Sequence, residues 1–98
     1  MTVARVFGVR PKPGCADEFE RNVREHSIPA LRRADGLVSF HAGRSLDGAE
    51  LVMVTIWRDL EAVWARAGEH WRDAVLYGDE ASLVAESSAE HFSSVAFG

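Results

Sequence analysis

Apolar residues occupy nearly every position from Leu51 to Trp57, and only Thr55 interrupts the run. A strand with one solvated face alternates apolar and polar residues, whereas a nearly continuous apolar run is typical of a strand covered on both faces. A chain of 98 residues has few helices with which to cover two faces. The pattern therefore predicts a strand over 51–57 and indicates that a second copy of the chain covers one side of it.

The pattern before this strand predicts a strand, a long helix and another strand. Val3–Val9 is rich in valine and phenylalanine, and the prolines and glycine of 11–14 end it. The helix is expected from about Ala16 to Ala34, and Asp35-Gly36 ends it before a strand over Leu37–Arg44. One face of the helix carries, at helical spacing, Phe19, Val23, His26, Ala30 and Ala34.

Pro29 lies inside this predicted helix. A proline within a helix removes a hydrogen bond and crowds the carbonyl group four residues earlier, here that of Glu25. We therefore expect a kink near Glu25–Pro29 or a break into two segments.

The pattern after the central strand predicts a second helix and a last strand. A turn at 45–48 precedes the central strand, and Asp59 is expected to cap the helix that follows it. A short helical turn is expected over Ala81–Ala85, and a last strand over His91–Phe97. The second helix carries an apolar stripe made of Leu60, Val63, Trp64, Ala67, Trp71 and Val75.

The order strand, helix, strand, strand, helix, strand predicts a ferredoxin-like α+β fold, βαββαβ, with an antiparallel sheet and both helices on one face. The other face of the sheet is then bare and apolar, which predicts a homodimer through the sheet face, a dimeric α/β barrel. The sequence shows no internal repeat or linker, so residues 1–98 are expected to form a single domain.

Composition and charge exclude several classes of function. The net charge is −4 and the basic residues are scattered, so nucleic acid is not an expected partner. Cys15 is the one cysteine, which excludes an internal disulfide and a cysteine-rich zinc site. No apolar run approaches the ~20 residues that span a bilayer, and the first residues lack the core of a signal peptide. We expect a soluble cytoplasmic protein without a membrane partner.

The segment from Ile56 to His70 resembles the antibiotic biosynthesis monooxygenase domain family, of the dimeric α/β barrel superfamily. Further similar features are Pro13-Gly14, the pair His26 and Pro29, the spacing from Pro29 to Gly36, and His91-Phe92. The resemblance implies the barrel fold and a range of activities, from cofactor-independent oxygenation of aromatic polyketides to heme degradation. The heme-degrading members use an Asn on the first strand, but the one Asn of this chain is Asn22, which disfavours that activity.

Aromatic and histidine side chains are the candidates for a site. Trp64 and Trp71 predict either a core anchor or, with Phe19 and Val23, the wall of an apolar pocket for a flat ligand. The histidines are candidates for proton transfer, with His26 first and His70 second, ahead of His41 and His91. No two histidines on one element have the spacing of metal ligands and no phosphate-binding glycine loop occurs, so we expect neither a metal nor a cofactor.

The leading hypothesis is a cofactor-independent monooxygenase-like protein that acts on a small aromatic or quinone-type molecule. The alternative is a non-catalytic domain that binds a small ligand or a partner on the same dimeric scaffold. An isomerase or lyase of the same superfamily is a third option, which would act without consuming oxygen. The sequence does not choose among them.

Overall fold

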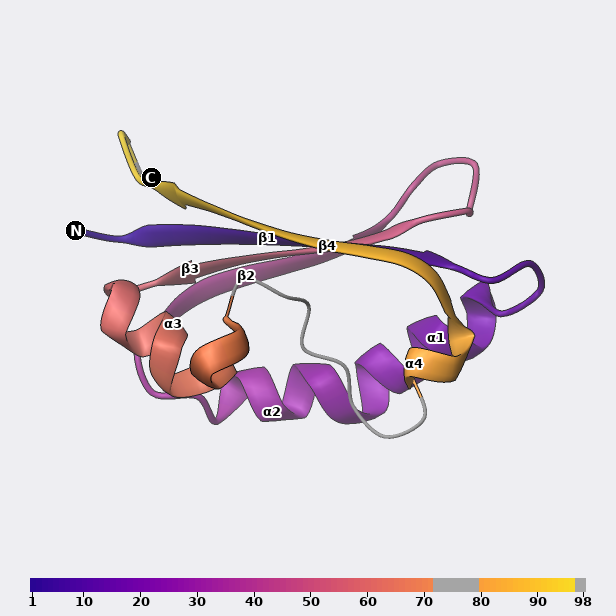
Figure 1. The fold of residues 1–98 in the computed structure, drawn as a ribbon, viewed down its shortest axis with the longest axis horizontal. Coiled ribbons are helices and arrows are strands. Elements are labelled where there is room, and N and C mark those ends of the chain that lie inside the picture. The colour runs from indigo at the N-terminus through magenta and orange to yellow at the C-terminus, as the bar shows by residue number, and fades with distance from the viewer. Residues whose placement is uncertain (72–79, 97–98) are drawn as a thin grey trace.

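The computed structural model describes residues 1–71 and 80–96, which form a sheet with helices on one of its faces (Figure 1). The strands are β1 (Val3–Pro11), β2 (Leu37–Arg44), β3 (Leu51–Trp57) and β4 (Val84–Ser93). They lie in the order β2-β3-β1-β4, and every neighbouring pair is antiparallel. The predicted ferredoxin-like α+β fold is confirmed.

The first helical region consists of α1 (Ala16–Asn22), the π-helical turn η1 (Val23–Ser27) and α2 (Ile28–Arg32). The irregularity expected near Pro29 is therefore present as a π-helical turn that directly precedes the proline's segment. In a regular α-helix the ring of Pro29 would crowd the carbonyl group of Glu25. This carbonyl group lies in the π turn, which is wider than an α turn and so leaves room for the ring. The region ends at Arg32, two residues before the predicted end at Ala34.

The wide turn also changes which residues face the sheet. The buried residues of this region are Phe19, Val23, Ser27 and Leu31, a strict spacing of four. In a regular α-helix, each residue in such a series is rotated by about 40° around the helix axis from the one four positions earlier. The wider π turn rotates the series in the opposite direction, so that all four residues stay on one face. The prediction that His26 lies on the inner face was wrong, because the π turn brings Ser27 there and leaves His26 exposed.

The second helical region consists of α3 (Leu60–Ala67), the short 3₁₀ turn η2 (Gly68–His70) and, after the segment outside the described residues, α4 (Glu80–Leu83). Asp59 caps α3 as predicted, and its Oδ1 accepts a hydrogen bond of 2.9 Å from the backbone N–H of Ala62. One helix continuing through Trp71 was a wrong prediction, because Gly68 has a φ of 72° and ends α3. The predicted stripe position Val75 lies outside the described residues.

Strand β4 begins at Val84, seven residues before the predicted start at His91, and ends at Ser93. It lies at the edge of the sheet and pairs with β1 along its length. Its first half is rich in serine and glutamate, so the pattern of apolar residues does not predict a strand there. An edge strand tolerates such residues because much of its surface contacts water.

The two faces of the sheet differ in their surroundings. In β3 the residues directed at the helices, Leu51, Met53, Thr55 and Trp57, are buried. The alternate residues Val52, Val54 and Ile56 are exposed or half-buried, because no helix of the described residues covers that face (Figure 1). Coverage of the strand on one side is thus seen within the chain, whereas coverage by a second copy stays a prediction. None of the described helices is long and apolar enough to span a membrane.

Candidate functional site

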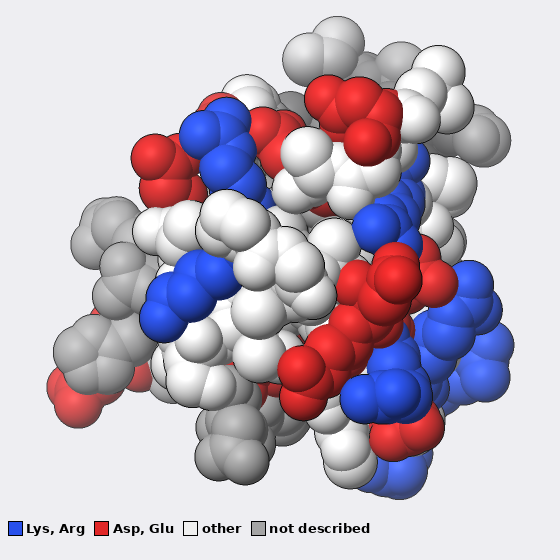
Figure 2. Space-filling view, turned by 90° about the vertical axis from the view of Figure 1, so that its right-hand side faces the viewer, with Lys and Arg blue, Asp and Glu red and all other residues white. Residues whose placement is uncertain are grey.

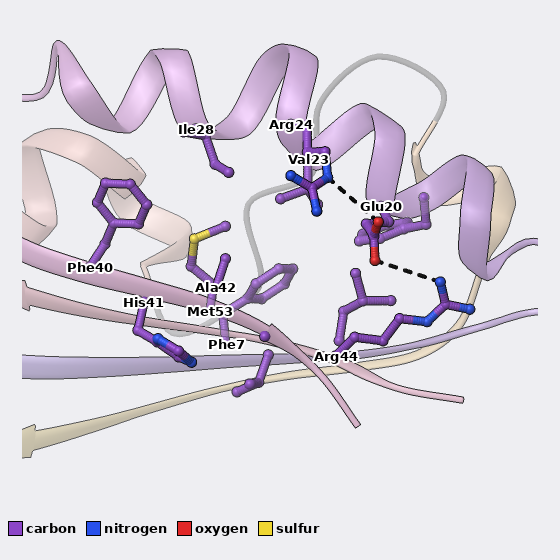
Figure 3. A pocket seen from close by; sticks show the side chains of 14 residues that line it. Phe7, Glu20, Val23, Arg24, Ile28, Phe40, His41, Ala42, Arg44 and Met53 are labelled. Carbon is purple, nitrogen blue, oxygen red and sulfur yellow. Dashed lines mark hydrogen bonds and ion pairs between the residues drawn. The ribbon is translucent and has the colours of Figure 1, made fainter. Parts of the chain in front are cut away.

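An open cavity of about 430 Å³ lies between the first helical region and the sheet, and we call it the outer cavity. Helix residues form its roof, and β1, β2 and β3 form its floor (Figure 3). Its lining consists of Phe7, Phe19, Glu20, Val23, Arg24, Ile28, Phe40, His41, Ala42, Gly43, Arg44, Leu51, Val52 and Met53. A volume of this size and a largely apolar wall suit a small aromatic ligand.

Local structure explains why these side chains meet. Phe19 and Val23 are four residues apart on the helix face that is directed at the sheet. Phe40 and Ala42 alternate along β2 on the same side of the sheet as Met53 of β3, because Ala42 pairs with Met53. In Figure 3 Phe40, Met53 and Phe7 point toward the helices, whereas His41 points below the strands.

Charged side chains form the rim of the outer cavity at one end. Glu20 lies between two arginines, with its Oε2 3.5 Å from Arg24 Nε and its Oε1 3.5 Å from Arg44 Nη1 (Figure 3). Arg44 Nη1 also donates a hydrogen bond of 2.8 Å to Asp17 Oδ1, which raises the pKa of the Arg44 guanidinium above its ordinary value. The rim is therefore an ion-pair network. Acidic and basic side chains also lie next to each other on the face shown in Figure 2.

A second cavity, of about 50 Å³, lies on the same side of the sheet, and we call it the inner chamber. Phe7 and Met53 line both cavities, so these two side chains form a wall between them. The other lining residues of the inner chamber are Arg5, Ser27, Leu31, Thr55, Trp57 and Arg66. The inner chamber is therefore much smaller than the outer cavity, and both have largely apolar linings with a few charged side chains.

Arg5 connects the inner chamber to β4. The Arg5 residue is 6% exposed, and its Nη1 donates hydrogen bonds to the backbone carbonyl of Trp71 and, at 2.9 Å, to His91 Nε2. Because a guanidinium can only donate, the His91 Nε2 accepts this bond. The sequence offers a signal for Arg5, because an alternating strand directs Arg5 to the same side as Val3 and Val9.

The predicted aromatic residues divide between two places. Phe19 and Val23 line the outer cavity, as described above. Trp64 and Trp71 line neither cavity; their ring centroids are 6.2 Å apart, and the Trp64 residue is 44% exposed. Trp71 also contacts His91, with a centroid distance of 4.8 Å and an edge-on geometry. The structure thus places the tryptophans beside Arg5 and His91 rather than beside Phe19 and Val23.

The histidine candidates lie apart from one another. His26 is exposed on η1, and its positive form would stabilise the ionised carboxylate of Glu80 on α4. His70 ends η2, and its side chain is outside the described part of the structure. His91 ranked behind His26 and His70 as a candidate for proton transfer. Among the described histidines, it is the one that hydrogen-bonds to a residue of the inner chamber, Arg5. Among the described residues, no group of three or more potential ligands could hold a metal ion.

The protein is therefore an α+β protein of the ferredoxin-like fold. The cavity between its sheet and its helices can hold a small ligand. The chain belongs to the antibiotic biosynthesis monooxygenase family, whose profile matches residues 2–76. The family resemblance read from the sequence is therefore confirmed. None of the curated proteins compared with the chain matched it.

Solved structures share this fold over nearly their whole length. Rv0793 from Mycobacterium tuberculosis is 22% identical with a TM-score of 0.78, and the match covers 99% of this chain and 98% of that one. SnoaB, a cofactor-independent oxygenase from Streptomyces nogalater, is 20% identical with a TM-score of 0.73, covering 98% and 95%. The heme-degrading protein Rv3592 from Mycobacterium tuberculosis is 21% identical with a TM-score of 0.70, covering 100% and 99%. At these identities the likeness shows the fold alone.

Proposed function

We propose that this protein is a cofactor-independent monooxygenase that acts on a small aromatic or quinone-type molecule held in the outer cavity. The observation that carries the proposal is the outer cavity itself, an apolar space of about 430 Å³ in a chain of the monooxygenase family. The likeness in fold to a cofactor-independent oxygenase supports it. The chain lacks the first-strand Asn of heme-degrading members, which argues against that chemistry.

The proposed reaction oxidises an activated CH₂ group of an anthrone-type substrate. Loss of a proton to solvent gives a carbanion, which passes one electron to O₂. The two radicals combine to form a C–O bond, and the resulting peroxide anion takes a proton back from solvent to become a hydroperoxide. The resulting hydroperoxide loses water and leaves a carbonyl group, so that one O₂ is consumed and one water is released. The protein holds the ring in the apolar cavity, excludes water and favours the anionic form of the substrate.

Oxygen consumption with an anthrone or a hydroquinone tests the proposal. We expect turnover above the uncatalysed rate, and we expect Ala42→Phe to reduce it by at least about ten-fold, because a phenyl ring at Ala42 would occupy the outer cavity. Ala65→Phe, at an exposed position of α3, is the matched control and should retain the rate. Oxygen uptake no faster than with heat-denatured protein would exclude the reaction for these substrates.

A second candidate function is non-catalytic binding of the same kind of ligand. It is favoured by the rim of the outer cavity, where Glu20 is held in ion pairs with Arg24 and Arg44. On this reading the ligand binds without oxygen uptake, and His26→Ala and His70→Ala leave its affinity nearly unchanged. An isomerase or lyase would instead convert the substrate without consuming oxygen.

We also propose that the protein acts as a homodimer through the face of the sheet that the helices leave open. Apolar side chains gather there on neighbouring strands, because Val6 pairs with Val54 and Ala4 pairs with both Ile56 and Phe92. The Phe92 residue is 51% exposed within one chain. A second copy would cover this face and would supply buried area that so small a domain lacks.

A further inference from the structure

We infer that two copies of this chain pack their open sheet faces together around a two-fold axis parallel to the strands, so that His41 of each copy contacts Glu90 of the other. The inference rests on the homodimer proposed above. It adds the orientation of the two copies and the polar contact that selects this orientation. The face concerned is the one that the described helices leave open (Figure 1).

One row of residues crosses the open face from edge to edge. His41 on β2 lies opposite Val54 on β3, and Val54 lies opposite Val6 on β1. Val6 in turn lies opposite Glu90 on β4. Two valines therefore form the middle of the row, and a histidine and a carboxylate form its ends. Both end residues are exposed within one chain.

The side chain of His41 lies on the open face. It points below the strands, away from the helices, in Figure 3. Its Nε2 would lie 3.3 Å from a Cβ added at Gly43, the next residue of β2 on the same side. The imidazole therefore extends along the β2 edge of the face. His41 also lines the outer cavity, so a second copy bound here would lie next to the proposed ligand site.

A two-fold axis parallel to the strands reverses the strand order and keeps each row at its level. The order β2-β3-β1-β4 of one copy then faces the order β4-β1-β3-β2 of the other. Sheets packed face to face keep their mean strand directions within about 30° of each other, which such an axis allows. His41 of each copy then faces Glu90 of the other. A histidine N–H can donate a hydrogen bond to a carboxylate in either protonation state.

The row nearer the chain's N-terminus is complementary in size in this orientation. Ala4 lies between Ile56 and Phe92, and Ser39 lies on the other side of Ile56. Reversal of the strand order places Ala4 of one copy against Ile56 of the other. It also places Ser39 against Phe92, which is 51% exposed within one chain. Small side chains thus face large ones, as in packed sheets whose side chains interdigitate.

Charges at the other end of the face fit the same orientation. Within one chain, Arg10 on β1 forms ion pairs with Glu50, at 2.8 Å, and with Glu86, at 3.4 Å. Because β1 of one copy faces β3 of the other, Arg10 would lie opposite Glu50 of the second copy. Charges of opposite sign would therefore meet at this end as well.

A two-fold axis that runs across the strands gives a poorer match. With such an axis through the middle row, Glu90 would face Glu90 of the second copy, and facing like charges oppose association. With the axis nearer to Arg10, Val6 would face Arg10 of the second copy, which places a charge against an apolar side chain. The axis parallel to the strands pairs opposite charges instead, and charge complementarity therefore selects it.

The test measures the dissociation constant of the dimer by sedimentation equilibrium over a range of protein concentrations. We expect His41→Glu to raise this constant by at least about ten-fold, because two pairs of carboxylates would then face each other across the interface. Adding Glu90→Lys to the same chain should bring the constant back to within about three-fold of wild type, since opposite charges face each other again.

A rescue of this kind reports a contact between copies. Within one chain, positions 41 and 90 lie on opposite edge strands, about 14 Å apart by three strand spacings, so the two substitutions interact weakly there. The matched control combines His41→Glu with Glu61→Lys, at an exposed position of α3. It has the same net charge as the rescued variant and should remain as weakly dimeric as His41→Glu alone.

The outcomes separate this inference from the proposed function. A wild-type protein that is monomeric at micromolar concentration would contradict both the homodimer and the contact. A wild-type dimer that His41→Glu does not weaken, or that Glu90→Lys does not rescue, would leave the homodimer in place and overturn the orientation. Equal rescue by Glu61→Lys would trace the effect to net charge and overturn it too. Oxygen uptake by the wild-type protein tests the monooxygenase proposal independently.

Discussion

Glu80 is a carboxylate in a buried position at the start of α4. It is 1% exposed, and this burial raises the pKa of its carboxyl group to about 7. The nearby His26 opposes the shift, because its positive form favours the ionised carboxylate. A glutamate with a pKa this far above the usual value changes its charge near neutral pH.

We predict that Glu80→Gln makes the protein less sensitive to rising pH. The carboxyl group has a higher pKa in the folded state than in the unfolded state, so the folded state binds the proton more tightly and loses stability as pH rises from about 4.3 to about 7. Urea unfolding at a series of pH values should show the stability of the variant gaining on wild type between pH 5 and pH 8.

The control for this prediction is Glu61→Gln, at an exposed position of α3. Its stability relative to wild type should change little over the same range. A difference between Glu80→Gln and wild type that stays constant with pH would show that the Glu80 carboxyl group does not titrate differently in the folded protein.

Only some residues of the site could be predicted from the sequence. Phe19 and Val23 were placed at a pocket from helical spacing, and both line the outer cavity. His26 was placed on the same face, and the π turn moves it out, which a regular helical period cannot anticipate. Arg5 and Arg66 were missed because they come together only through the packing of α3 on the sheet, a contact between residues far apart in sequence.

Among the helices and strands, the junction between α2 and β2 depends on Gly36. Its φ of 84° suits glycine, as its position after the predicted helix indicated, and its carbonyl accepts a hydrogen bond of 2.7 Å from the backbone of Arg58. A Cβ added at Gly36 would lie 2.5 Å from the Cβ of Ala62 on α3. The absence of a side chain therefore lets α3 approach the start of β2.

We predict that Gly36→Ala destabilises the protein by about 2–4 kcal/mol, because it adds a steric clash to the strain of a positive φ. Gly14→Ala is the matched control: Gly14 has a φ of 81°, but a Cβ there meets nothing within 4 Å. Only the backbone strain applies to the control, so we expect a loss of about 1 kcal/mol. Urea denaturation measures both, and equal losses would show that the contact with Ala62 does not matter.

Elements with strong local signals were predicted well. The bounds of β2 and β3 agree with the sequence prediction, because each strand lies between turn-forming residues. The bounds of α3 and β4 were wrong for different reasons. Gly68 ends α3 although the apolar spacing continues to Trp71, and β4 begins in a polar segment because its long pairing with β1 stabilises it.

For the molecule as a whole, the open face of the sheet leads to a prediction about assembly. We expect Val54→Lys to convert the proposed dimer to a monomer at micromolar concentration, because Val54 lies between Val6 and His41 in the middle of that face. Sedimentation equilibrium or light scattering would measure the mass in solution.

Leu46→Lys provides the control, since it introduces the same charge at a fully exposed apolar residue of the β2–β3 turn and should leave the dimer intact. Should the wild-type protein itself prove monomeric at micromolar concentration, the proposed assembly would be wrong. The fold would stand in that case, because the order and pairing of the strands are formed within one chain.

The wall shared by the two cavities contains a side chain that the proposed reaction could oxidise. Met53 contributes a thioether to that wall, next to the proposed position of the ring in the outer cavity. Peroxidic intermediates convert thioethers to sulfoxides, which are polar and less flexible in their packing. Each release of such an intermediate would thus expose Met53 to oxidation and damage the wall. The damage would accumulate with turnover unless a sulfoxide reductase restored Met53.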